Sequence, residues 1–99
     1  MIFEVAHIAV KPGMQAAFER GVAEAAPLFQ RAKGCHGLAL QRGIEQATHY
    51  RLVVQWETVE DHMVTFRNSE DFQGWRRLVG HCFESAPQVE HVATVLQPF

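Results

Sequence analysis

Residues 54–72, VQWETVEDHMVTFRNSEDF, contain the end of a strand, a capped helix, a break and a second helix start. Thr58 and Asp61 have the spacing of a capping box, in which a side-chain oxygen accepts a hydrogen bond from a first-turn N–H. A second cap at Asn68 or Ser69 is followed by acidic residues, which suit the positive end of a helix dipole. The stretch therefore predicts a strand that leads directly into a broken helix.

The apolar residues of this broken helix form one stripe. Before the break, the members at positions i, i+3, i+4 and i+7 of an α-helix are Val59, His62, Met63 and Phe66. After the break the stripe continues with Phe72, Trp75 and Val79. His62 is the one titratable side chain on this face. We expect the strand and the broken helix to enclose a pocket between them.

The chain has 99 residues, which suffices for one domain over residues 1–99. Its hydrophobic content of 47% is typical of a folded globular protein rather than a disordered one. The formal net charge is -2 and the basic residues form no long runs, which argues against nucleic-acid and anionic-membrane partners. Apolar runs of membrane-spanning length are absent from the sequence.

The N-terminal sequence MIFEVAHIAV lacks the basic start and cleavage site of a signal peptide, so we expect a cytoplasmic location. In that compartment Cys35 and Cys82 are expected to stay reduced. Neither cysteine belongs to a C-x-x-C pair, so a structural zinc site or a thioredoxin-like redox site has no support.

The order of elements predicts the fold. Strands are expected at Ile2–Val10, Cys35–Ile44, His49–Glu57 and Gln88–Leu96, with one helix at residues 14–32 and the broken helix before the last strand. Pro27 is expected to kink or divide the first helix near Ala26. The resulting β-α-β-β-α-β order predicts an α+β, ferredoxin-like fold with both helices on one face of a four-stranded antiparallel sheet.

Such a sheet leaves its second face open, yet the strands carry apolar residues on both faces. In the first strand Phe3, Val5 and Ala9 alternate with Ala6 and Ile8, for example. Apolar side chains on both faces indicate that both faces are covered. We therefore predict a homodimer in which the open sheet face packs against a second copy of the chain.

Several short motifs resemble one known family. They are KPG at residues 11–13, KGC at 33–35, VVQWET at 53–58, EDH at 60–62 and SEDF at 69–72. Together they are similar in order and spacing to the antibiotic biosynthesis monooxygenase domain, over nearly the whole chain. The resemblance implies a ferredoxin-like unit that dimerises into an α+β barrel, in agreement with the element order.

The family includes cofactor-free oxygenases of polyphenolic polyketides, haem-degrading proteins and small-molecule isomerases, so the fold does not choose the chemistry. Haem-degrading members carry an Asn, a Trp and a haem-ligating His at positions that align with His7, Phe66 and Arg76. None of these three residue types is kept here, which disfavours haem degradation. The resemblance then implies a monooxygenase, an oxidoreductase that acts on a small aromatic, phenolic or polyketide-like substrate.

Three side chains are candidates for catalysis: His7 and His62 as a base, and Arg76 as the group that holds a developing oxyanion. His7 is expected to face the helices from the first strand. A histidine that is buried with a hydrogen-bond partner remains the alternative for His7 and His62, and a solvated helix face remains the alternative for Arg76. Candidates for substrate binding are Phe18, Trp56, Met63, Phe66, Phe72, Trp75 and His91, although burial in the core also explains the tryptophans.

The sequence contains no glycine-rich phosphate or dinucleotide motif, no nucleophile elbow and no zinc-binding histidine spacing. No cofactor and no metal site are therefore expected, and the expected partner is a small hydrophobic or aromatic molecule. Two other functions stay open. A dimeric barrel without catalytic activity would bind such a molecule without consuming oxygen, and an isomerase or lyase would exchange protons without consuming it.

Overall fold

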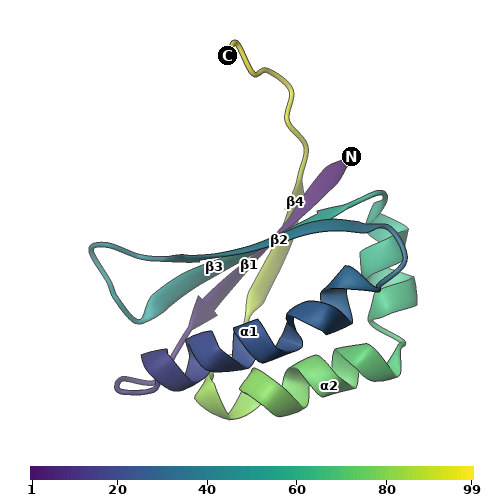
Figure 1. Ribbon diagram of the computed structural model, residues 1–99. Helices are drawn as coiled ribbons and strands as arrows, with labels where there is room; N and C mark the ends of the chain where they lie inside the picture. The colour runs from purple at the N-terminus through teal and green to yellow at the C-terminus, as the bar shows by residue number, and fades with distance from the viewer.

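The computed structural model describes residues 1–99 and has the predicted ferredoxin-like order. The elements are β1 (Ile2–Ala9), α1 (Gln15–Gln30), β2 (Cys35–Arg42), β3 (His49–Trp56), the π-helix η1 (Asp61–Phe66), α2 (Glu70–Val79), the short 3-10 helix η2 (Gly80–Cys82) and β4 (Gln88–Val92). The four strands form one antiparallel sheet in the order β2-β3-β1-β4. Figure 1 shows α1 and α2 side by side on one face of this sheet, while its other face is open.

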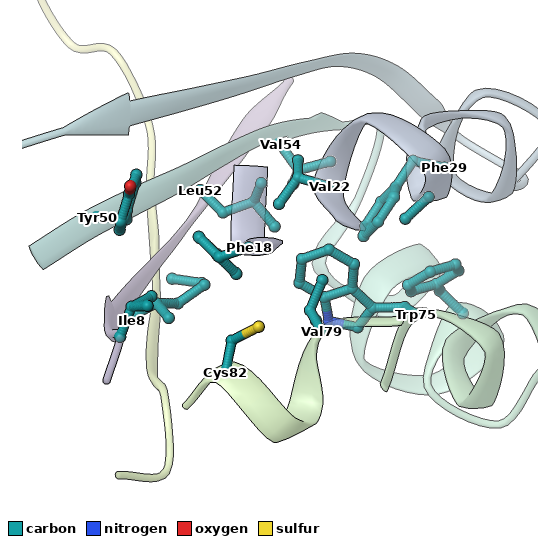
Figure 2. Close-up of a cluster of buried hydrophobic side chains, with 14 of the residues drawn as sticks. Ile8, Phe18, Val22, Phe29, Tyr50, Leu52, Val54, Trp75, Val79 and Cys82 are labelled. Atoms are coloured by element: carbon teal, nitrogen blue, oxygen red, sulfur yellow. The ribbon is translucent and has the colours of Figure 1, made fainter. Parts of the chain in front are cut away.

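The hydrophobic core lies between the sheet and the two helices. The apolar stripe of α1 is buried in full: Phe18, Val22, Ala25 and Phe29. Alternate residues of β3 meet it from the sheet: Tyr50, Leu52, Val54 and Trp56. Figure 2 shows this interdigitation, with Trp75 and Val79 of α2 closing the core from below. None of the helices is both long and apolar enough to cross a membrane.

Two expectations about the elements were not met: the division of α1 at Pro27 and the length of the last strand. Helix α1 is neither ended nor divided by Pro27, because the helix continues to Gln30 and the Pro27 carbonyl accepts a hydrogen bond from Arg31 N at 3.2 Å. Strand β4 ends at Val92 instead of Leu96. The pairing of β4 with β1 ends at Phe3 and Val92, and residues 93–99 leave the body as an extended tail (Figure 1).

The first half of the broken helix is a π-helix, and this changes which residues are buried. Arg67 N donates to His62 O at 3.1 Å, which is an i→i+5 bond. The wider turn places Asp61, His62 and Phe66 inward. Met63 within η1 and Val59 just before it are exposed, so the predicted α-helical stripe was wrong for these two residues.

The predicted caps are confirmed on both sides of the break. The Thr58 hydroxyl oxygen accepts a hydrogen bond from Asp61 N at 3.0 Å, and the Ser69 hydroxyl oxygen accepts one from Phe72 N at 3.2 Å. The first cap lies in the turn that leads into η1, and the second lies at the start of α2.

Candidate functional site

A cleft of about 400 Å³ lies between the sheet and α2, in the position where a pocket was expected. Its floor is aliphatic, with Ala6, Ile8 and Leu52 on the sheet and Val89 on β4. Phe72, Trp75 and Arg76 of α2 form one wall, and Arg67 stands at the end of η1. The segment that follows η2 completes the rim with Phe83, Ser85, Ala86 and Pro87. The volume lies within the range of sites that bind small molecules.

The cleft carries two guanidinium groups with no acidic partner. Neither Arg67 nor Arg76 takes part in an ion pair, and the buried Nε of Arg67 has no hydrogen-bond acceptor. The Arg67 guanidinium instead lies 5.8 Å from the centre of the Phe72 ring. An apolar cleft with two unpaired cations is suited to an apolar molecule that carries negative charge on an oxygen.

A buried polar cluster lies one step further along the sheet. Ala6 pairs with Val89 at the cleft, and the next inward-facing pair of β1 and β4 is Glu4 with His91. His62 joins them from η1, with its Nε2 3.2 Å from Glu4 Oε1 and its Nδ1 2.8 Å from His91 Nε2.

Trp56 supports this cluster from β3. Its indole Nε1 donates to Glu4 Oε1 at 3.0 Å, and its ring stacks on the His62 imidazole at 5.3 Å between centroids. Trp56 itself is fully buried, so it holds both partners in place. The cluster thus joins side chains from β1, β3, η1 and β4.

Burial sets the protonation of the two central groups. It raises the pKa of the Glu4 carboxyl from 4.5 to about 7, although the Trp56 hydrogen bond and the charge of Arg67 oppose the rise. Burial also lowers the pKa of the His62 imidazole from 6.5 to about 4, and the positive charges of His91 and Arg67 act in the same direction. Near neutral pH, His62 is therefore an uncharged hydrogen-bonding group.

His7 does not face the helices, so the predicted strand phase was wrong. Its side chain is exposed on the open sheet face, where Nε2 lies 2.6 Å from Glu90 Oε2. Its two neighbours on β1, Ala6 and Ile8, line the cleft instead. His7 instead borders a wide hollow of about 720 Å³ at the β2–β3 end of the sheet.

The predicted substrate-binding residues divide into three groups. Phe72 and Trp75 line the cleft, as does the catalytic candidate Arg76. Phe18, Trp56 and Phe66 are buried in the core, which explains their aromatic character without a ligand. Met63 is exposed on the outer side of η1, and His91 contacts His62 in the polar cluster.

Glu4 and Arg67 are the two residues of this region that the sequence prediction did not select. Glu4 had a visible signal, because it is the one acidic residue among Ile2, Ala6, Ile8 and Val10 on the buried face of β1. Arg67 had none, because its place at the cleft depends on the π-helical turn before it.

No three His, Cys, Asp or Glu side chains are arranged to hold a metal ion. In the polar cluster the reason is geometric, since Glu4 and His91 contact opposite nitrogens of the His62 ring and do not converge on one point.

Comparison with known proteins gives consistent matches over most of the chain. The sequence pattern described as Antibiotic biosynthesis monooxygenase matches residues 1–78. The protein YczJ of Bacillus subtilis (strain 168), itself uncharacterised, is 36% identical over 95 residues, which cover 96% of this chain and all of the relative.

Among solved structures, a Bordetella bronchiseptica protein that carries the same family name is 61% identical, with a TM-score of 0.95 over 96% of this chain and 97% of its own. SnoaB of Streptomyces nogalater, described as a cofactor-independent oxygenase, is 16% identical, with a TM-score of 0.79 over 98% of this chain and 95% of its own. At 16% identity, the match to SnoaB supports the fold alone.

Proposed function

Since the chain belongs to the antibiotic biosynthesis monooxygenase family, we propose that it is a monooxygenase whose substrate is a small, electron-rich phenol or enol bound in the cleft beside α2. The observation that carries this proposal is the pair of unpaired arginines, Arg67 and Arg76, at an apolar cleft. The aliphatic floor and the rings of Phe72 and Trp75 suit an aromatic body. The guanidinium groups suit the phenolate or enolate oxygen that forms when the substrate loses a proton.

An anthrone illustrates the chemistry. Its ring CH2 group loses two protons and four electrons to become a carbonyl group, and dioxygen accepts the four electrons. One oxygen atom forms the new carbonyl, and the other takes up the two protons and leaves as water. The substrate supplies all the electrons, so the proposed reaction uses no cofactor. The protein has to favour the anion, position it and exclude water.

The haem-degrading branch of the family fits this cleft poorly. Its three characteristic positions, His7, Phe66 and Arg76, do not meet in one place here. His7 is on the opposite face of the sheet, and Phe66 packs in the core against Phe29 and Trp56. Arg76 alone lines the cleft, and a guanidinium is not a haem ligand.

Homodimerisation through the open sheet face is part of the same proposal. Across the centre of that face, Val5 of β1, Val53 of β3 and Ala39 of β2 are neighbours in the sheet register. Phe3 and Val92 form a second apolar pair beside them. A second copy that covers these residues would close the two sheets into an α+β barrel and leave both clefts outside the interface.

Oxygen uptake with an anthrone or a naphthohydroquinone tests the function. Wild-type protein is expected to accelerate uptake, and Arg67→Met or Arg76→Met to raise KM about tenfold or more through loss of a charge-assisted hydrogen bond. Arg77→Met is the matched control, because Arg77 is also an exposed arginine of α2 but does not line the cleft. Binding without oxygen uptake would point to a non-catalytic binding protein, and proton exchange without uptake to an isomerase or lyase.

A further inference from the structure

The polar cluster beside the cleft has the connectivity of a proton wire. Glu4 contacts one nitrogen of His62, and His91 contacts the other, at 3.2 Å and 2.8 Å. Glu4 and His62 are 5% and 3% exposed, whereas His91 is only partly buried. The row therefore runs from a buried carboxyl, through a buried imidazole, to an imidazole that reaches solvent.

A neutral imidazole has one N–H donor and one bare nitrogen that accepts. Because both nitrogens of His62 have partners, His62 must donate to one and accept from the other. If Glu4 is protonated, it donates to Nε2, and the Nδ1–H of His62 donates to His91. If Glu4 is ionised, Nε2–H donates to the carboxylate, and Nδ1 accepts from the Nε2–H of His91.

We propose that Glu4, His62 and His91 form a proton relay that carries a proton between the buried Glu4 carboxyl, one residue pair beyond the cleft, and solvent. In the outward direction the Glu4 O–H bond breaks as a proton passes to His62 Nε2. The His62 Nδ1–H bond breaks as its proton passes to His91 Nε2, and His91 releases its Nδ1 proton to water. Three protons each move by one bond, one net proton leaves, and His62 ends neutral with its hydrogen on the other nitrogen.

The charges around the pair permit both the protonated and the ionised state of Glu4. The charged or titratable groups that act on the pair are Arg67 at the end of η1, His91 on β4 and Cys35 on β2. Arg67 lowers the pKa of both Glu4 and His62, and it also lines the cleft. With the Glu4 pKa at about 7, the carboxyl is near its midpoint at neutral pH, so a proton can move in either direction.

The use of this relay in catalysis rests on the proposed oxygenase function, since in that reaction the substrate loses a proton to form its anion and protons are taken up again when the product water forms. Arg67 is the link between the two sites: it would hold the substrate anion on one side and sense the charge of Glu4 on the other. Glu4, His62 and His91 then act as positioning and proton-transfer groups behind the cleft, and the substrate itself contacts Arg67 and the apolar wall.

Nitrogen-15 NMR of the histidine rings tests the relay without any substrate. The relay predicts that the hydrogen of His62 moves from Nδ1 to Nε2 as the pH rises through about 7, while the ring stays neutral. In Glu4→Gln the atom that Trp56 and His62 both contact must be the amide oxygen, because the Trp56 N–H only donates. The His62 Nε2–H then donates to that oxygen, so the hydrogen is expected to stay on Nε2 at every pH. A His62 tautomer that does not change with pH in the wild-type protein would overturn the proposal.

Activity supplies a second readout that separates this proposal from the proposed function. With an anthrone as the probe, Glu4→Gln and His62→Phe are expected to lower kcat at least tenfold and to remove an inflection near pH 7, with KM changed less than twofold. His7→Gln is the control, because it removes an exposed His–Glu contact of similar length. If kcat is unchanged in both variants, the relay has no catalytic use. If the wild-type protein consumes no oxygen, the oxygenase function fails, while the tautomer measurement still decides the relay.

Discussion

His62 Nε2 lies 3.2 Å from Glu4 Oε1, and this buried contact joins two groups whose pKa values move in opposite directions. Burial disfavours both charged forms, so Glu4 keeps its proton and His62 does not take one up. Between about pH 4 and about pH 7 the contact is a hydrogen bond between neutral groups rather than an ion pair. A buried neutral pair avoids the large cost of burying two charges.

This pairing predicts that the contributions of Glu4 and His62 to the pH dependence of stability cancel each other. From pH 4.5 to pH 6.5 the unfolded chain holds one proton on the pair, at His62, and the folded chain also holds one, at Glu4. Because the pair binds the same number of protons in both states, it gives the free energy of unfolding no pH dependence in this range. In Glu4→Gln only His62 remains, so stability is expected to fall by ~3 kcal/mol as the pH drops from 6.5 to 4, because the unfolded chain takes up the proton first.

In His62→Phe the slope is expected to be opposite. The raised pKa of Glu4 gives a contribution that is fully present below pH 4.5 and is lost, by ~3 kcal/mol, as the pH rises through about 7. Urea midpoints at several pH values, compared with wild type so that other groups cancel, measure both slopes. Variants that both keep the wild-type pH profile would show that the buried pair is not neutral.

The sequence predicted the fold well because its local signals agree with one another. The caps at Thr58 and Ser69 each act within three residues, and the structure confirms both. The phase of β1 was harder. Its two faces are almost equally apolar, so alternation alone does not decide whether His7 or Glu4 meets the helices.

The candidate site was predicted only in part, because local sequence signals give the direction of a side chain only within a regular element. Phe72 and Trp75 belong to the apolar stripe of a regular α-helix, where spacing gives direction, and both line the cleft. Arg76 lines it too, but it was selected through the family resemblance and not through spacing. Met63 was placed wrongly because a π-helix turns by a different angle per residue. Contacts between distant elements, such as His62 with His91, depend on strand register, which no local pattern contains.

Gly34→Ala is expected to destabilise the protein by roughly 2–4 kcal/mol. Gly34 has a φ of +78°, which disfavours a side chain, and an added Cβ would collide with the carboxyl group of Asp61 at the start of η1. Gly13→Ala is the matched control, since Gly13 has a φ of +88° with open space around it, and should cost only about 1 kcal/mol. Urea unfolding measures both, and equal costs would rule out a steric role for Asp61.

Arg67→Met is expected to stabilise the protein while it weakens ligand binding. The unpaired buried Nε carries a desolvation cost, and methionine fills similar space without it, so the free energy of unfolding should rise by about 1 kcal/mol. The positive charge that lowers the pKa of Glu4 also disappears, so that pKa should rise above its wild-type value. Thermal unfolding together with NMR titration of Glu4 measures the two effects. A loss of stability would mean that Arg67 packs or pairs favourably in the fold.

Val53→Lys is expected to convert the proposed dimer into a monomer. Val53 lies at the centre of the open sheet face, with Val5 and Ala39 as its neighbours in register, and a lysine there would place a charge in the middle of an apolar interface. Light scattering should give twice the chain mass of 11.2 kDa for wild type and the single mass for the variant. Val64→Lys is the control, because Val64 is an exposed valine of η1, away from the sheet. A wild-type monomer at micromolar concentration would refute the dimer. A dimeric Val53→Lys variant would place the interface on another face of the molecule.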